Sequence, residues 1–177
     1  MKKLAVIFPG AGYGLDCPLL YYADFLFETK GYDRIAMNYE GILCNRNLGL
    51  DEKIKQLRQY ELEKIGGIDF GAYDELIFLA KSVGTVEAGW IAEKMDVKVQ
   101  QIFLTPIKEA MDYCIGTTKV VIGTEDPAYT AYREHCDGTN IDTLYIEGAN
   151  HSLEVIGRPY ESIEALKKVM EFIDEET

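Results

Sequence analysis

Short apolar runs alternate with amphipathic segments along most of the chain. Six of the runs are rich in Val, Ile, Leu and Phe and end at glycine or proline clusters, which is typical of strands buried on both faces. We expect strands at residues 4–8, 34–39, 75–80, 99–104, 118–122 and 142–146. None of the runs approaches the length of about 18 apolar residues that a membrane span needs.

Apolar residues recur at helical spacing in three of the segments between or after these runs. The stripes lie in residues 19–27, 83–91 and 163–173, and each would cover one face of a helix. Residues 129–136 are predicted as a further helix, whereas residues 40–49 show no pattern and are expected to form a loop. Because strands alternate with helices, the predicted fold class is α/β, a three-layer sandwich around a mostly parallel six-stranded sheet. The chain has no repeat or linker, so residues 1–177 are predicted to form a single domain.

Charge narrows the classes of partner. The 177 residues include 30 Asp and Glu but 18 Lys and Arg, a formal net charge of −12. Such a field repels phosphate backbones and anionic lipids, so we expect neither a nucleic-acid nor a membrane partner. The apolar run near the N-terminus stops at Pro9, short of a signal peptide. The four cysteines form no C-x-x-C pair, which favours reduced thiols in a cytoplasmic protein.

The sequence offers little for a metal or cofactor. The two histidines lie far apart and the cysteines do not cluster, so we expect no metal site. Gly10, Gly12 and Gly14 follow the first apolar run and resemble the dinucleotide fingerprint G-x-G-x-x-G. However, Leu15 stands where the third glycine belongs, and the next helix is expected to begin near Pro18. Nucleotide binding is therefore kept as an alternative, and no cofactor is expected.

A serine lies directly at the end of the third predicted strand, where an α/β sheet carries its chemistry. The segment Ala80-Lys81-Ser82-Val83-Gly84 leads from this strand into the next helix. Small residues two before and two after Ser82 fit a nucleophile elbow, because the turn is too tight for larger side chains. The alternative is that Ser82 merely caps the helix.

Two later strand ends supply the groups that a serine nucleophile requires, a base and a residue that orients it. Asp126 follows the fifth predicted strand and His151 follows the sixth, so both should reach the same edge of the sheet as Ser82. Glu125 is the alternative carboxylate. His135 falls within the predicted helix 129–136 and is expected to be a surface residue.

With these pieces in order, essentially the whole chain resembles the α/β-hydrolase superfamily. The segments that carry the resemblance are Phe8-Pro9-Gly10-Ala11-Gly12, Ala80-Lys81-Ser82-Val83-Gly84, Gly123-Thr124-Glu125-Asp126 and Gly148-Ala149-Asn150-His151. Members usually have eight strands, so the resemblance implies a trimmed sheet of six in the order 2-1-3-4-5-6. It also implies that the cap is missing, because residues 105–116 between the fourth and fifth strands hold about one short helix.

The resemblance implies a role for each site residue. Ser82 would be the nucleophile, His151 the general base and then acid, and Asp126 the carboxylate that holds the imidazole; the family's spacing from Gly123 favours Asp126 over Glu125. The backbone N–H groups of Ala11 and Val83 would form the oxyanion hole. The expected substrate-binding loop contains Gly10, Gly12 and Tyr13, although Pro9-Gly10 replaces the His-Gly common in the family.

A lidless cleft is open to water, which favours hydrolysis and small acyl groups. The expected function is a serine hydrolase that cleaves a small carboxylic ester or thioester through an acyl-enzyme. Its expected partner is a small-molecule acyl substrate, while the oligomeric state is left open. The alternatives are a non-catalytic binding protein with this fold and an acyltransferase that uses the same residues.

Side chains that could shape the cleft are less clearly assigned. Tyrosines near the first two strand ends could line the cleft or belong to the core: Tyr13, Tyr21, Tyr22 and Tyr39. Lys81 and Arg158 could attract an anionic group, but both are expected to be exposed cations with no such purpose.

Overall fold

The computed structural model describes residues 1–175 and 177. Its six strands form one sheet in the order β2-β1-β3-β4-β5-β6, and every neighbouring pair is parallel. The strands are β1 (Lys3–Phe8), β2 (Asp33–Ala36), β3 (Glu75–Lys81), β4 (Gln100–Leu104), β5 (Thr118–Gly123) and β6 (Asp142–Ile146). The α/β class, the parallel sheet and the predicted strand order are all confirmed.

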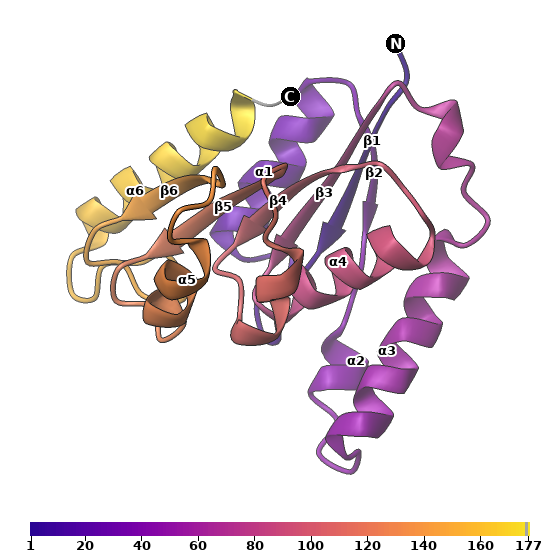
Figure 1. Cartoon of the computed structure of the whole chain (residues 1–177), viewed down its shortest axis with the longest axis horizontal. Helices are drawn as coiled ribbons and strands as arrows, with labels where there is room; N and C mark the ends of the chain where they lie inside the picture. The colour runs from indigo at the N-terminus through magenta and orange to yellow at the C-terminus, as the bar shows by residue number, and fades with distance from the viewer. Residues whose placement is uncertain (176) are drawn as a thin grey trace.

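Helices cover both faces of this sheet (Figure 1). One face carries α1 (Pro18–Thr29) and α6 (Pro159–Asp174), and the other carries α3 (Leu50–Ile65), α4 (Val83–Lys94) and α5 (Tyr129–Cys136). The shorter helical elements are α2 (Glu40–Leu43) and the 3-10 helices η1 (Phe70–Ala72) and η2 (Lys108–Tyr113). Among the described residues, helices that combine the length and apolarity of a bilayer span are absent.

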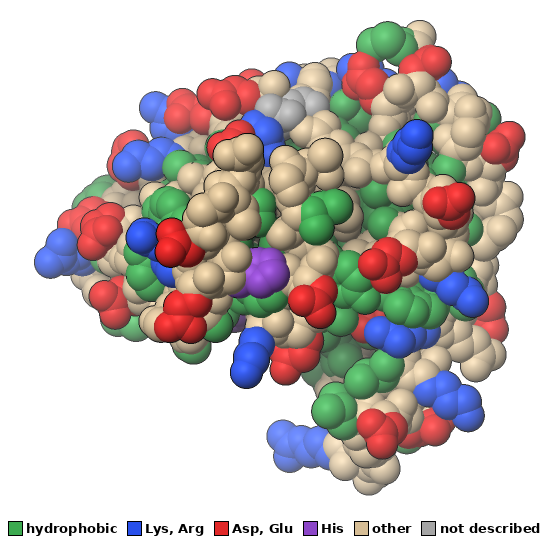
Figure 2. Space-filling view, in the orientation of Figure 1, with side chains coloured by type: hydrophobic (Ala, Val, Ile, Leu, Met, Phe, Trp, Pro, Cys, Tyr) green, Lys and Arg blue, Asp and Glu red, His purple; other side chains and the backbone are tan. Residues whose placement is uncertain are grey.

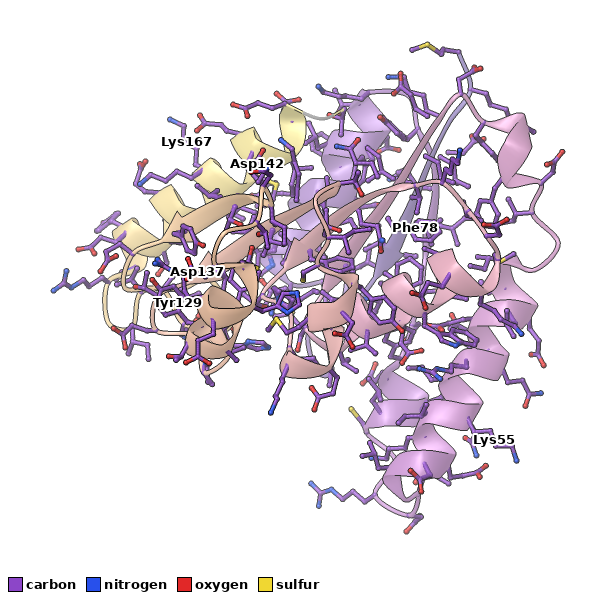
Figure 3. The ribbon with its side chains drawn as sticks, in the orientation of Figure 1. Lys55, Phe78, Tyr129, Asp137, Asp142 and Lys167 are labelled. Atoms are coloured by element: carbon purple, nitrogen blue, oxygen red, sulfur yellow. The ribbon has the colours of Figure 1, made fainter. Side chains whose placement is uncertain are left out.

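The core has two halves because side chains alternate across each strand. Val6 and Phe8 of β1 pack toward α3, α4 and α5, whereas Ala5 and Ile7 pack toward α1 and α6. Figure 3 shows Phe78 of β3 pointing into the interior, while Lys55 on α3 points to solvent. The strands therefore read as continuous apolar runs, as expected for a sheet buried on both faces.

The region after β1 and β2 differs most from the prediction. The expected strand 34–39 ends early, since β2 stops at Ala36 and Asn38 begins a turn by accepting a hydrogen bond from the Glu40 N–H at 3.1 Å. The predicted loop 40–49 is partly wrong, because its first residues form α2.

Helix α3 was not predicted, and its burial pattern explains why. Its buried residues are Leu57, Glu61 and Ile65, so a carboxylate occupies the middle of a narrow apolar stripe. Most of its other side chains are polar or charged. The sequence of α3 therefore lacks the wide apolar stripe by which an amphipathic helix is predicted.

Candidate active site

Ser82 joins β3 to α4 in a strained conformation. Its φ of 55° and ψ of −121° lie in a region that non-glycine residues rarely adopt, and such strain is concentrated at functional sites. The Ser82 N–H donates to the Leu104 carbonyl at 3.0 Å, and the Thr85 hydroxyl donates to the Ser82 carbonyl at 2.6 Å. The Ser82 side chain makes no capping hydrogen bond to α4, so the helix-cap alternative is wrong.

Glycines allow the surrounding backbone to approach this turn. A Cβ added at Gly84 would lie 2.3 Å from the Phe8 carbonyl oxygen, and one at Gly10 would lie 3.3 Å from the Ser82 Cβ. The loop after β1 therefore packs directly against Ser82. This is the steric requirement that the elbow pattern in the sequence indicated.

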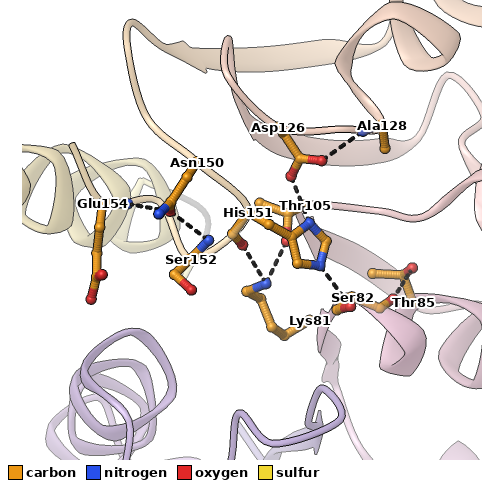
Figure 4. Close-up of polar contacts among 10 residues, drawn as sticks. All are labelled: Lys81, Ser82, Thr85, Thr105, Asp126, Ala128, Asn150, His151, Ser152 and Glu154. Carbon is orange, nitrogen blue, oxygen red and sulfur yellow. Dashed lines mark hydrogen bonds and ion pairs between the residues drawn. The ribbon is translucent and has the colours of Figure 1, made fainter. Parts of the chain in front are cut away.

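Ser82, His151 and Asp126 form an unbroken chain of hydrogen bonds (Figure 4). The Ser82 Oγ lies 2.8 Å from His151 Nε2, and His151 Nδ1 lies 2.7 Å from Asp126 Oδ2. An ionised carboxylate can only accept hydrogen bonds, so Nδ1 carries the imidazole proton and Nε2 is left to accept from the Ser82 hydroxyl. The imidazole is therefore oriented to take a proton from Ser82.

The carboxylate end of this chain is buried and fully paired. The Asp126 side chain is 0% exposed, compared with 38% for His151. Its second oxygen, Oδ1, accepts from the Ala128 N–H at 2.8 Å. Glu125, the alternative carboxylate, is exposed, whereas Asp126 is the carboxylate that bonds to His151. His135 is exposed on α5 as predicted.

The loops after β5 and β6 are bonded to each other. The Glu125 N–H donates to the Ala149 carbonyl at 2.9 Å, and a Cβ at Gly123 would lie only 2.0 Å from the same oxygen. Asn150 stabilises the turn around His151, since its side-chain oxygen accepts from the Ser152 N–H at 2.8 Å and the Glu154 N–H at 3.1 Å. Asp126 and His151 are thus held by one connected pair of loops.

Lys81 is buried, so the prediction of an exposed cation is wrong for this residue. It is 1% exposed, and its Nζ donates to Thr105 Oγ1 at 2.5 Å and to the His151 carbonyl at 2.7 Å. Burial lowers the pKa of the amine to about 8, although the charge of Asp126 opposes this shift. Arg158 is exposed as expected and pairs with Glu161 at 3.1 Å.

The predicted oxyanion loop forms a tight turn beside Ser82. Gly10 and Tyr13 exchange backbone hydrogen bonds of 3.1 and 3.3 Å, and Gly12 adopts a positive φ of 70° between them. Within the described part of the chain, no backbone carbonyl accepts from the N–H of Ala11 or of Val83. Both donors are therefore available to a ligand, and Val83 lies in the first turn of α4, where N–H groups favour negative charge.

This turn also lines a cavity of about 380 Å³, whose lining includes neither Ser82 nor His151. Its lining comes from the segment after β1 and from the segment between β2 and α2, and includes Tyr13, Asp16, Met37, Tyr39, Glu40 and Cys44. The lining contains two carboxylates but neither lysine nor arginine. Of the four tyrosines considered from the sequence, Tyr13 and Tyr39 line this cavity, whereas Tyr21 and Tyr22 are exposed on α1.

A second group of polar side chains packs behind Tyr39 of the cavity, and the sequence pattern did not predict it. The Tyr39 hydroxyl donates to Glu61 of α3, and Arg58 pairs with Glu87 of α4 at 3.2 Å. Burial and the neighbouring Glu87 carboxylate raise the pKa of Glu61 to about 8. The only signal in the sequence was a glutamate within an apolar stripe.

The structure offers little support for metal or dinucleotide binding. No group of three or more His, Cys, Asp or Glu side chains in residues 1–175 and 177 is arranged to hold a metal ion. Helix α1 begins at Pro18, well beyond Gly10 and Gly12, so these glycines do not form the helix N-terminus that cradles a pyrophosphate.

Comparison with known proteins finds similar folds among solved structures. No protein-family model matches the sequence, and no curated protein matches it. Among solved structures, this chain is similar to Est1E from Butyrivibrio proteoclasticus, with a TM-score of 0.67 and 13% sequence identity. The match covers 98% of this chain and 88% of the Est1E chain. A further Est1E structure has ferulic acid bound.

Two other hydrolases are similar to the same share of the chain. Dienelactone hydrolase from Anabaena variabilis matches 98% of this chain and 84% of its own at a TM-score of 0.69 and 17% identity. Alpha/beta hydrolase domain-containing protein 10 from mouse matches 98% of this chain and 90% of its own, at a TM-score of 0.64 and 12% sequence identity. The resemblance seen in the sequence is confirmed at the level of architecture, and the chain has the fold of the α/β-hydrolase superfamily.

Proposed function

We propose that this protein is a serine hydrolase that cleaves small carboxylic esters or thioesters through an acyl-enzyme. The observation that carries the proposal is the continuous chain from Ser82 through His151 to Asp126, which begins at a strained turn. A serine hydroxyl needs an adjacent base to become a useful nucleophile, and the base needs a third group to orient it.

The reaction divides into acylation and deacylation of Ser82, and His151 first takes and then gives a proton in each. Ser82 Oγ attacks the substrate carbonyl while Nε2 of His151 takes the hydroxyl proton, and the imidazolium then gives this proton to the leaving alcohol or thiol. Asp126 stabilises the imidazolium and keeps the proton of Nδ1 in place. A water molecule then uses the same base to release the acid and regenerate Ser82.

The negative charge that develops on the substrate oxygen would be held by the N–H groups of Ala11 and Val83. Both are unpaired with backbone carbonyls in the described chain. Val83 follows Ser82 directly, and Gly10, which precedes Ala11, packs against Ser82. Each such donor is worth about 2.7 to 4 kcal/mol of transition-state stabilisation where it has been measured.

Substrate size and charge are suggested by the cavity beside the oxyanion loop. Its volume of about 380 Å³ would hold a small acyl or alcohol group, and its two carboxylates disfavour anionic substrates. The connection from β4 to β5 holds the short η2, and His151 is 38% exposed, so water can reach the acyl-enzyme.

The proposal is tested with a fluorophosphonate, which bonds only to a serine whose base and oxyanion donors are assembled. We expect a single adduct by intact mass on the wild-type protein and none on Ser82→Ala or His151→Ala. Ser152→Ala is the matched control, because it removes a neighbouring hydroxyl and should leave labelling intact. Absence of an adduct on folded wild-type protein, or an adduct that persists in Ser82→Ala, would contradict the proposal.

Turnover then distinguishes hydrolysis from transfer. Aryl esters and thioesters of increasing acyl length should be hydrolysed continuously, with preference for short or neutral acyl groups. Rapid acylation of Ser82 without further turnover would instead indicate an acyltransferase that lacks its acceptor.

A further inference from the structure

Lys81 is a buried charged group next to Ser82 that the proposed reaction does not use. It is adjacent to the nucleophile in the chain, and its ammonium group reaches the backbone of the proposed base, where Nζ lies 2.7 Å from the His151 carbonyl oxygen. We propose that Lys81 is a positioning residue, which holds the imidazole of His151 against Ser82 by fastening the His151 backbone. This inference rests on the proposed function.

The connectivity explains why such a fastening is useful. His151 lies in the turn between β6 and α6, where its ring position depends on a stretch of loop, whereas Ser82 is fixed at the end of a central strand. Lys81 belongs to that strand, so its main chain leads directly to Ser82 and its side chain bonds to His151. One residue therefore sets both ends of the bond between Ser82 Oγ and His151 Nε2.

Two hydrogen-bond acceptors and one aromatic ring surround the Lys81 ammonium group. Thr105 Oγ1 accepts at 2.5 Å, the His151 carbonyl accepts at 2.7 Å, and the Tyr13 ring lies 5.1 Å from Nζ, within cation–π range. These partners come from three different loops, after β1, β4 and β6. Because an unpaired buried charge is strongly unfavourable, this pairing ties the three loops to one point.

The backbone conformation of Thr105 independently supports the proposed role of Lys81. It is 0% exposed and has a φ of 48°, a conformation that is strongly disfavoured for a β-branched residue. Its N–H donates to the Val121 carbonyl at 2.7 Å, which holds the residue in place. The strained backbone presents Oγ1 to the Lys81 amine, and strain of this kind persists only where the surrounding structure maintains it.

Two other roles for Lys81 fit the contacts less well. As a cation for an anionic substrate it would need exposed donors, but it is 1% exposed and its donors are directed at protein acceptors. As a base for Ser82 it would need to face the hydroxyl, but that hydroxyl lies 2.8 Å from His151 Nε2. Lys81 therefore acts through His151 and does not itself touch the reacting atoms.

The charge state of Lys81 supplies a signature that a purely structural residue would lack. Burial lowers its pKa to about 8, while the charged forms of Asp126 and Cys17 oppose the shift, and Tyr13 and His151 are its other titratable neighbours. Bonds donated by an ammonium are about twice as strong as those of a neutral amine. We therefore expect kcat to fall as pH rises above about 8.

The test compares Lys81→Met with Lys119→Met. Lys119 is a half-buried sheet lysine that pairs with Asp142 at 2.9 Å, far from Ser82, so its loss controls for removing a lysine from the sheet. Lys81→Met should lower kcat by about 10- to 100-fold with little change in KM, a range typical of residues that orient a functional side chain. Fluorophosphonate labelling of Ser82 should slow by the same factor, and the alkaline fall in kcat should disappear. Lys119→Met should match wild type in all three.

A proton NMR measurement reports on the base directly. The low-field resonance of the His151 Nδ1 proton should be sharp in wild type and in Lys119→Met, and broadened or absent in Lys81→Met. Unchanged kcat, labelling rate and resonance in folded Lys81→Met would overturn the inference. An equal loss of kcat in Lys119→Met would overturn it too.

A second variant keeps the test decisive if Lys81→Met does not fold. Thr105→Val retains the lysine but removes one acceptor of its charge, so the alkaline fall in kcat should move to lower pH. If kcat of Thr105→Val fell at the same alkaline pH as kcat of the wild-type protein, the inference would be overturned. If wild-type protein is labelled at Ser82 and Lys81→Met behaves like wild type, only the role of Lys81 is refuted. If wild-type protein is never labelled, the proposed function is refuted as well.

Discussion

Two groups of polar side chains, each with buried charges at its centre, differ in how completely they are paired. The site group contains Lys81, Ser82, Asp126 and His151, and each of its members has hydrogen-bond partners at 2.5 to 2.8 Å. The acid group contains Tyr39, Arg58, Glu61 and Glu87. There the Oε2 oxygen of Glu61 is buried and has no hydrogen-bond partner among the described residues.

The difference shows what each arrangement can do. In the site group, Asp126 accepts from His151, and Lys81 donates to Thr105 and to the His151 carbonyl, so fixed donors and acceptors define a single geometry. In the acid group, Arg58 pairs with Glu87, whereas burial and the charge of Glu87 raise the pKa of Glu61 to about 8. The first arrangement fits the proposed reaction, whereas the second is expected to make the stability of the fold sensitive to pH.

Replacing Asp126, which pairs with His151 in the site group, should reduce activity more than any other substitution considered below. In Asp126→Asn the amide oxygen can still accept from the Ala128 N–H, so its NH₂ faces His151 and forces the wrong tautomer of the imidazole. We expect kcat for ester hydrolysis to fall by about 10⁴-fold with the fold unchanged, as in comparable sites. Glu125→Gln, which changes the exposed neighbouring carboxylate, should retain activity within about two-fold. Similar kcat values for the two variants would exclude Asp126 as the orienting carboxylate.

Disturbing the backbone that supports Ser82 should have the next largest effect. In Gly84→Ala the new Cβ would lie 2.3 Å from the Phe8 carbonyl and 2.6 Å from the Pro9 carbonyl, so α4 and the loop after β1 must separate. We expect a loss of about 1 to 3 kcal/mol in the free energy of unfolding, measured by urea denaturation, together with slower fluorophosphonate labelling.

Gly41→Ala is the control for this prediction. A Cβ at Gly41 meets open space within the short helix α2, so the substitution should be neutral or slightly stabilising. If Gly84→Ala were as stable and as readily labelled as Gly41→Ala, the close packing of the elbow against β1 would be refuted.

The same comparison explains which parts could be predicted from the sequence. The site group lies at strand ends, where buried apolar runs mark the strand and the next residues fall at a common edge; Ser82, Asp126 and His151 could be placed together on that basis. The sheet order came from the resemblance to a family. Lys81 could not be placed, because lysine is nearly always exposed and only the packed loops around it make burial favourable. Helix α3 was hidden because Glu61 occupies a core position.

The acid group makes a prediction about stability. The folded-state pKa of Glu61 is raised to about 8 from an ordinary value near 4.5, so the folded protein binds the extra proton between these values. The stability that this group contributes is fully present below its unfolded pKa and is lost as pH rises through about 8. The urea midpoint of the wild-type protein should therefore fall from about pH 5 to about pH 8.

Replacing Glu61 isolates this contribution. Glu61→Gln keeps an acceptor for the Tyr39 hydroxyl but cannot ionise, so the midpoint should vary less over the same pH range. Glu63→Gln, an exposed position on the same helix, should retain the wild-type dependence. A pH dependence that is identical in all three proteins would show that Glu61 does not carry it.

The smallest effect should come from the cavity beside the oxyanion loop, whose lining includes Tyr39 of the acid group. Cys44 is exposed at the cavity, and Cys17, which is half-buried, is the other thiol in its lining. A bulky maleimide on Cys44 would fill space that an extended acyl group needs, and peptide mapping would confirm the site of attachment. We expect KM to rise several-fold for longer acyl esters while acetyl esters are turned over normally, because a change of this kind is worth about 1 kcal/mol or less. Cys44→Ser should be insensitive to the reagent. If modification left KM unchanged for every acyl length, substrates would bind on the open side of Ser82 instead, and the carboxylates of the cavity would have no part in selecting them.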